Sequence, residues 1–475
     1  MAIRIPTLKD CAFLFSITIL LLFTGTVVLK LPITILLIGA AVIAGIKTWR
    51  LGHTWSEIEA GIVKGVAGTL PPVMILLMVG TLSGSWIASG TIPALIYYGL
   101  ELISPQWYLI ATFMICSIVG VSIGSSWTTA ATVGIALVGI GVALGINPAL
   151  CAGSVISGAY FGDKLSPLSD TTNLAPGVAG TDLFLHIRTM LITTIPAWII
   201  TMGIFVYFGY GVIREGSFDP VQVDVLQKAI GSSFSITPFV LIPLLVVIIL
   251  AAMKFPAVVI LIAGWIAGIL CAVSLQGAGI IDTLQASYSG FSIHSGNEVL
   301  DKLLNRGGIL SFMETILIIL CATGLSGIWE SGGFIRSLHD NLLQRIRSEK
   351  GLVITTVITA MLSNVLMAEQ YLSIVVTGRI YRDAFENKRL APRMLSRSLE
   401  DGGTVTSPLV PWNSCGAFMS AALGVPTIAY LPYAFFNLIM PVVAITFTLL
   451  GLFIIRDETF SKIQADAFAG DFPRE

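Results

Sequence analysis

The chain has 475 residues, of which 55% are hydrophobic and 11% are charged, and its formal net charge at pH 7 is −1. Soluble globular proteins carry about 25% charged residues because their surfaces face water. The composition therefore excludes a water-facing globule, and the near-neutral charge gives no basic surface for nucleic acid. Most of the surface must instead face membrane lipid.

Apolar runs of about 20 residues recur along the chain, the length at which a helix crosses about 30 Å of hydrocarbon. They lack the alternation of polar and apolar residues that is typical of membrane β-barrel strands. In chain order, crossings are predicted near residues 11–29, 33–50, 68–88, 148–176, 190–210, 236–253, 256–276, 308–329, 392–423 and 428–455. Segments 107–145 and 351–378 are predicted to form re-entrant hairpins, which enter and leave the membrane on one side. The fold class is an all-α membrane protein.

The distribution of basic residues predicts the orientation of the chain. If the N-terminus faces the cytoplasm, 19 of the 26 Lys and Arg residues fall in cytoplasmic segments and five in external ones. Basic residues are enriched in cytoplasmic loops. Both termini are therefore predicted to be cytoplasmic.

Short sequences of the first half recur in the second half. The sequence Leu-Ser-Gly-Ser-Trp at 82–86 returns with one substitution 243 residues later at 325–329, and Ser-Pro-Leu at 166–168 returns 241 residues later at 407–409. Each half has five predicted crossings, an odd number, so the second half starts on the opposite side of the membrane. The sequence therefore predicts two inverted-topology repeats, an architecture found in many secondary transporters.

The repeats divide the chain into a first transmembrane repeat at 1–210, a linker loop at 211–235, a second repeat at 236–455 and a cytoplasmic tail at 456–475. Segment 277–307 has no counterpart of equal length in the first half. It is predicted to be an external insertion.

Four polar segments interrupt the apolar helices in corresponding places of the two predicted repeats. They are 122–129, 162–173, 363–370 and 400–414. Gly and Pro weaken helices, and freed backbone groups are tolerated at membrane depth only inside protein or beside a water-filled cavity. We therefore expect a hairpin and an unwound helix in each repeat, with oxygen-rich surroundings that suit a hard cation. For any one break, a kink that eases packing is the alternative.

Acidic residues within the predicted crossings and hairpins are candidates for binding an ion or a proton, because an ionised Asp at a helix centre costs about 2.5–3.5 kcal/mol on insertion scales. They are Asp163, Asp170, Glu369, Glu314 and Asp401. Asp170 has no basic neighbour in the sequence and is the leading ligand. Asp163 could instead pair with Lys164, and Asp401 could balance Lys164 or Arg397. Glu314 could carry a proton or make a hydrogen bond between helices.

Hydroxyl and amide groups of the same segments are the expected supporting ligands. They belong to Ser125, Ser126, Thr128, Ser169, Thr171, Thr172, Asn173, Asn364, Thr404, Ser407 and Asn413. The chain has no nucleotide-binding motif and no paired nucleophile and base, so the sequence predicts a transporter driven by ion gradients and not an enzyme. A channel is the other alternative, although channels usually gather their pores from several subunits.

The stretch from Gly162 to Asn173 resembles the NhaC family of Na+/H+ antiporters, as do residues 157–161 and 407–412. The resemblance covers essentially the whole chain. It implies exchange of internal Na+ for external protons in a bacterial inner membrane. It also implies a fold in which a hairpin and an unwound helix of each repeat surround the site.

With this resemblance, Na+ and H+ would compete for the carboxylates, and Na+ would bind through Asp163, Asp170 and Thr171. The transported Na+ and H+ are the only small ligands expected, with no cofactor, and a homodimer is left open. The family also has a branch that exchanges malate and protons for lactate and Na+, so transport of a small carboxylate is the alternative. An organic anion would need a fixed cation near the cavity, and Lys164 and Arg397 are the candidates within the membrane.

Overall fold

The computed structural model describes residues 3–214, 220–344 and 346–456. Within these ranges the chain is helical, and its β-pairing is limited to one isolated bridge between Leu390 and Arg456. The predicted tail at 456–475 lies outside the described residues apart from Arg456. The predicted linker at 211–235 is described except for residues 215–219.

The helices of the first half are α1 Leu8–Phe23, α2 Ile33–Arg50, α3 Trp55–Ala67, α4 Leu70–Ala88, α5 Thr91–Leu102, α6 Pro105–Ile123, α7 Ser126–Thr129, α8 Ile135–Ala143, α9 Pro148–Leu165, α10 Asp170–Ala179 and α11 Leu183–Arg214. Those of the second half are α12 Pro220–Ser233, α13 Ile242–Ala252, α14 Ala257–Leu275, α15 Ile280–Ser289, α16 Glu298–Leu304, α17 Met313–Ser331, α18 Phe334–Leu343, α19 Glu349–Met367, α20 Gln370–Asn387, α21 Pro392–Leu399, α22 Ser414–Leu423, α23 Thr427–Tyr430 and α24 Phe435–Leu449. Wider π-helical turns occur at Thr24–Val28, Ala130–Gly134 and Glu400–Thr404.

The all-α membrane class is confirmed. Nine helices of the described residues are long and apolar enough to cross a membrane, or up to eleven if each of two sharply bent helix pairs counts as one span. Two predicted crossings, 148–176 and 392–423, are each divided into shorter helices. Both legs of the first predicted hairpin, α6 and residues 126–143, are long enough to span by themselves.

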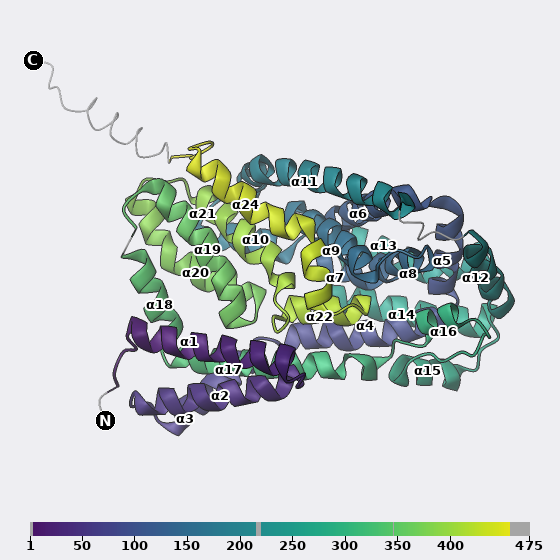
Figure 1. Ribbon diagram of the computed structural model, residues 1–475, viewed down its shortest axis with the longest axis horizontal. Coiled ribbons are helices and arrows are strands. Elements are labelled where there is room, and N and C mark those ends of the chain that lie inside the picture. The colour runs from purple at the N-terminus through teal and green to yellow at the C-terminus, as the bar shows by residue number, and fades with distance from the viewer. Residues whose placement is uncertain (1–2, 215–219, 345, 457–475) are drawn as a thin grey trace, which may run out of the picture.

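Figure 1 shows how the helices that surround the centre of the molecule are arranged. Helices α1, α2, α3 and α17 run along one edge, and α6 and α11 run along the opposite edge, with α9, α22 and α24 between them. Helices α18 to α21 gather at the end where the chain begins, and α12, α15 and α16 gather at the other end. The segments that were predicted to be broken therefore lie at the centre.

The two halves pack in a reciprocal manner. Helix α17 packs on α2 and α3, whereas α4 packs on α14 and α15. The glycine at the third position of the recurring motif makes the close contact in each half. A Cβ atom at Gly327 would lie 2.1 Å from the carbonyl oxygen of Gly61 in α3. A Cβ atom at Gly84 would lie 2.1 Å from the carbonyl oxygen of Ala286 in α15. Helix α15, inside the predicted insertion, thus takes the position on α4 that α3 takes on α17. Two related repeats would produce this pairing, and the inversion of their topology stays a prediction.

Substitution of Gly327 by Ala should destabilise the protein, because the new methyl group would overlap backbone atoms of α3. Overpacking of this kind costs about 1–3 kcal/mol. The matched control is Gly203→Ala in α11, where no atom lies within 4 Å of the added Cβ and Ala is a better helix former than Gly. Thermal unfolding of the detergent-purified proteins measures both. An unchanged melting temperature for Gly327→Ala would contradict the close contact.

Candidate functional site

Each predicted hairpin turns at its tip through the same two backbone conformations. A left-handed residue comes first, Gly124 (φ +72°) in one tip and Ala368 (φ +54°) in the other. An extended helix-capping residue follows, Ser125 or Glu369. The side chain of each cap accepts a hydrogen bond from the backbone N–H three residues later, at 3.2 Å for Ser125 and 2.9 Å for Glu369. Both tips therefore hold an oxygen-bearing side chain where a helix begins.

The helix after the first hairpin is broken where the sequence predicts it. Helix α9 ends at Leu165, and Ser166 to Ser169 separate it from α10. Ser169 caps α10 by accepting a hydrogen bond from the backbone N–H of Thr172 at 3.3 Å. The hydroxyl of Ser166 donates to the Val121 carbonyl oxygen of α6 at 2.7 Å, which ties the break to the first hairpin.

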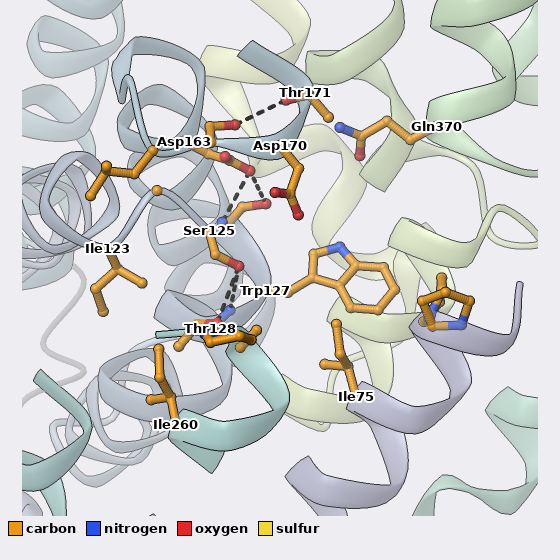
Figure 2. Close-up of a pocket in the computed structure, with 18 of the residues that line it drawn as sticks. Ile75, Ile123, Ser125, Trp127, Thr128, Asp163, Asp170, Thr171, Ile260 and Gln370 are labelled. Atoms are coloured by element: carbon orange, nitrogen blue, oxygen red, sulfur yellow. Dashed lines mark hydrogen bonds between the residues drawn. The ribbon is translucent and has the colours of Figure 1, made fainter. Parts of the chain in front are cut away.

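Asp163, near the end of α9, joins this break to the tip of the first hairpin. Its carboxylate accepts hydrogen bonds from the backbone N–H and the hydroxyl of Ser126, at 3.0 and 2.6 Å. Figure 2 shows Asp163 near Ser125 of the hairpin tip. Asp163 is only 7% exposed. Burial of a carboxylate is tolerated when such donors compensate for the lost water.

Lys164 does not pair with Asp163. Its ammonium group donates to Asp401 at 2.8 Å, and both side chains are almost fully buried. The second oxygen of Asp401 accepts a hydrogen bond from the Thr193 hydroxyl at 3.2 Å and lies 3.8 Å from Nε of Arg397. Of the pairings that the sequence left open, the structure shows those of Asp401 with Lys164 and, at a longer distance, with Arg397. The pair between Lys164 and Asp401 connects the two halves of the chain.

A cavity of about 560 Å³ opens between the two hairpin tips, the break after α9, and α4 and α14 (Figure 2). Three of the predicted carboxylates, Asp163, Asp170 and Glu369, line it. The predicted hydroxyl ligands in its wall are Ser125, Ser126, Thr128, Ser169 and Thr171. The basic group in its lining is Lys254. The cavity thus joins acidic groups of both halves of the chain.

The three carboxylates differ in their freedom to bind a ligand. Asp170 is exposed in the cavity, and the long 3.5 Å contact from the Tyr371 hydroxyl is its one side-chain hydrogen bond within the described ranges. Glu369 is 3% exposed, and one of its oxygens already accepts the capping hydrogen bond. Asp163 is held by Ser126. Asp170 is therefore the most accessible of the three carboxylates.

Eight of the predicted acidic and supporting ion ligands do not line the cavity. They are Glu314, Asp401, Thr172, Asn173, Asn364, Thr404, Ser407 and Asn413. Glu314 lies exposed in the first turn of α17. Most of the others hold the broken segments together; Thr172, for example, donates to the carbonyl oxygens of Asp163 and Lys164 at 3.2 and 3.1 Å.

The structure also brings residues to the cavity that sequence reasoning did not select. Gln370 accepts hydrogen bonds from Ser407 at 3.0 Å and from the Cys415 thiol at 2.7 Å. Trp127 stacks on Phe418, with ring centroids 4.0 Å apart. Gln370 and Trp127 each lie within two residues of a capping residue at a hairpin tip. That proximity in the sequence is the signal by which they could have been predicted to line the cavity.

A bound cation would need mixed ligands. In the described part of the chain, no three acidic, His or Cys side chains lie close enough to hold one metal ion together. One or two carboxylates would have to be joined by hydroxyl or carbonyl oxygens, a ligand set that suits hard cations.

Acidic residues at helix breaks around one cavity, inside a bundle of membrane-spanning helices, define a secondary transporter. The model of the Na+/H+ antiporter family matches residues 158–452. The chain belongs to this family, which confirms the resemblance noted in its sequence.

Three relatives are similar over most of their length. The Na+/H+ antiporter NhaC of Alkalihalophilus pseudofirmus is 38% identical over 94% of this chain and 97% of its own. The malate-2H+/Na+-lactate antiporter of Bacillus subtilis is 39% identical over 95% of this chain and 96% of its own. The arginine/ornithine antiporter ArcD of Halobacterium salinarum is 37% identical over 86% of this chain and 85% of its own. Overall identity therefore does not separate their substrates.

Loss of either partner of the Lys164–Asp401 pair should destabilise the protein more than loss of both. Removing one member of a buried ion pair costs about 3–5 kcal/mol because the other charge is left uncompensated. We expect Lys164→Met and Asp401→Asn each to lower the thermal unfolding temperature sharply. The double variant should recover much of that loss, and simply additive effects would contradict the pairing.

Proposed function

We propose that this protein exchanges Na+ for H+ across the bacterial inner membrane, with the proton gradient as the driving force. The observation that carries the proposal is the shared cavity, in which Asp163 and Asp170 of the first half meet Glu369 of the second. A similar protein of Alkalihalophilus pseudofirmus carries the name of such an antiporter, which supports the same function.

The charges around the cavity favour a cationic substrate. Its lining has three acidic groups and one basic group, Lys254. Lys164 and Arg397, the cations that an organic anion was expected to use, lie beside Asp401 and do not line the cavity. A cation entering the cavity would therefore meet a negative potential, whereas an anion would be repelled.

Competition for the carboxylates gives antiport in this proposal. A carboxyl group that holds a proton is a poor ligand for Na+, so each side of the membrane loads the ion that its pH and Na+ concentration favour. Asp170 is the first ligand because it is exposed in the cavity, and Thr171 adds a hydroxyl beside it. Asp163 completes the site while Ser126 holds its carboxylate in place.

The packing suggests which parts move together when access alternates. Glycines of α9 lie directly on α6, since a Cβ atom at Gly162 would lie 2.6 Å from the Ser117 carbonyl oxygen and one at Gly158 would lie 2.4 Å from that of Phe113. Such close backbone contacts do not slide easily. We therefore propose that the first hairpin and α9 move as one unit against the rest of the helices.

We also propose the orientation and the repeat that the sequence predicts, with both termini cytoplasmic. The unequal distribution of Lys and Arg supports the orientation. The matching hairpin tips and the reciprocal contacts of Gly84 and Gly327 support the repeat. The same architecture would bring the two hairpin tips toward each other from opposite sides.

Exchange of malate and protons for lactate and Na+ is the second candidate. Helices α10 and α20 both begin at the cavity, and the positive ends of their dipoles would attract a carboxylate substrate. The cavity is also larger than a single Na+ needs, and the relative from Bacillus subtilis is named for these substrates.

A pH-gradient assay in everted membrane vesicles distinguishes the two candidates. We expect Na+ to dissipate the gradient, and K+, malate and lactate to leave it unchanged. The half-saturating Na+ concentration should rise as the pH falls, by up to tenfold per pH unit if one proton is displaced per ion. A response that requires malate together with lactate would support the second candidate instead.

Substitution of Asp170 by Asn should abolish Na+-dependent proton flux in the same vesicles, because the amide cannot exchange a proton for Na+. The fold should survive, since Asp170 is exposed in the cavity. The matched control is Asp224→Asn, an exposed residue of α12 that pairs with Lys228. Full flux in the Asp170 variant would remove this residue from the mechanism.

A further inference from the structure

A second cavity, of about 160 Å³, lies at the C-terminal ends of α10 and α20. The N-terminal ends of these two helices lie at the first cavity, which Asp163, Asp170 and Glu369 line. Two arginines of α20 and the turn that follows it, Arg382 and Arg389, line its wall, together with Glu386. Part of the wall is apolar and is formed by Phe385, Leu390 and Leu395. These apolar side chains are almost fully buried, whereas Arg382 and Arg389 are exposed. The exposed charged groups here are mostly basic, unlike those of the first cavity, which are mostly acidic.

The two guanidinium groups have no partner in the described part of the protein. Neither Arg382 nor Arg389 makes a side-chain hydrogen bond or an ion pair there, although Glu386 lies on the same helix. The guanidinium of Arg382 extends over the end of α10, since a Cβ atom at Gly180 would lie 3.2 Å from its Nη2. The cavity therefore offers unused hydrogen-bond donors and an excess of positive charge.

Arg389 occupies a backbone position that favours glycine. Its φ angle is +57°, and it follows the last turn of α20. The backbone N–H of Arg389 donates to the carbonyl oxygen of Glu386 at 2.9 Å, and the backbone N–H of Leu390 donates to the carbonyl oxygen of Phe385 at 3.0 Å. This pair of hydrogen bonds is the Schellman motif at the end of a helix, in which the left-handed residue is usually Gly. A left-handed Arg is unfavourable compared with Gly. Its side chain, which lines the cavity, gives a reason for Arg at this position.

A third source of positive potential is the start of α21, which forms another wall of the cavity. Pro392 is its first residue, and no side chain caps its N-terminus. Nε of Arg393, in the same turn, is buried without a hydrogen-bond partner in the described residues. The positive end of the α21 dipole and this guanidinium oppose the negative dipole ends of α10 and α20, which also reach the cavity.

From these juxtaposed groups we infer that the cavity at the ends of α10 and α20 binds a phosphate group, carried by the headgroup of an anionic membrane lipid. Arg side chains bind phosphate oxygens in a bidentate manner, and basic pockets between membrane helices at the cytoplasmic side recognise lipid headgroups. The sequence predicts that this end of the molecule is cytoplasmic, and several helices end here. Free phosphate shares the same chemistry without the acyl chains.

Binding to the full-length protein in phosphatidylcholine nanodiscs tests the inference. Short-chain phosphatidylglycerol and inorganic phosphate are titrated separately, with native mass spectrometry and thermal stabilisation as the readouts. We expect the lipid to bind wild type and raise its melting temperature. Arg382→Gln should weaken binding about fivefold, the effect of losing about 1 kcal/mol from one arginine near an anionic headgroup.

Arg389→Gly separates ligand binding from folding. Glycine relieves the left-handed backbone, so this variant should be at least as stable as wild type without lipid, yet it should bind the lipid about fivefold more weakly. Arg379→Gln is the matched control, because it removes the same charge from α20 outside the lining of the cavity.

Each outcome decides the inference. Lipid binding that is weakened in Arg382→Gln and Arg389→Gly but unchanged in Arg379→Gln supports it. Equal binding of inorganic phosphate would assign the site to the free anion instead of the lipid. Unchanged lipid binding in both cavity variants, or an equal loss in Arg379→Gln, would overturn it in favour of diffuse surface charge.

Discussion

The structure depends on one constraint, which is that backbone groups freed at a helix break must find partners inside the membrane. The chain meets it with polar side chains next to the breaks. Asn173 donates to the carbonyl oxygens of Pro167 and Ser169 at 2.9 and 2.7 Å, and Asn437 donates to that of Val405 at 2.7 Å. Because these side chains compensate for the breaks, the remaining hydroxyls and carboxylates are free to face the cavity.

A buried ion pair joins the two halves of the chain beside the cavity. Lys164 belongs to the first half and Asp401 to the second, and both are buried next to residues of the broken segments. Glu400 lies beside them, fully buried, with neither carboxylate oxygen hydrogen-bonded within the described residues. Lys164 and Arg397 lie in this cluster and do not line the cavity, where three acidic groups face one basic group, Lys254.

The sequence predicted the helical class, the hairpin tips and the break after α9, because Gly, Pro and short polar residues interrupt apolar runs visibly. It also predicted Asp163, Asp170 and Glu369, since acidic residues are rare in such segments. It could not determine which acidic group Lys164 contacts, because its sequence neighbour Asp163 and the distant Asp401 were equally plausible partners. Glu314 was selected for its apolar surroundings, yet its helix face is exposed. Exposure of a helix face depends on neighbouring helices, which local sequence does not specify.

Proton release on addition of Na+ to the purified protein tests the central claim most directly, namely that Na+ displaces protons from carboxyl groups in the shared cavity. A pH-sensitive dye in weakly buffered detergent solution reports the release without any membrane or gradient. The wild-type protein should release protons on addition of Na+ but not K+, and the double variant Asp163→Asn/Asp170→Asn should release none. Undiminished release from the double variant, or Na+ binding to the wild-type protein without release, would contradict the account.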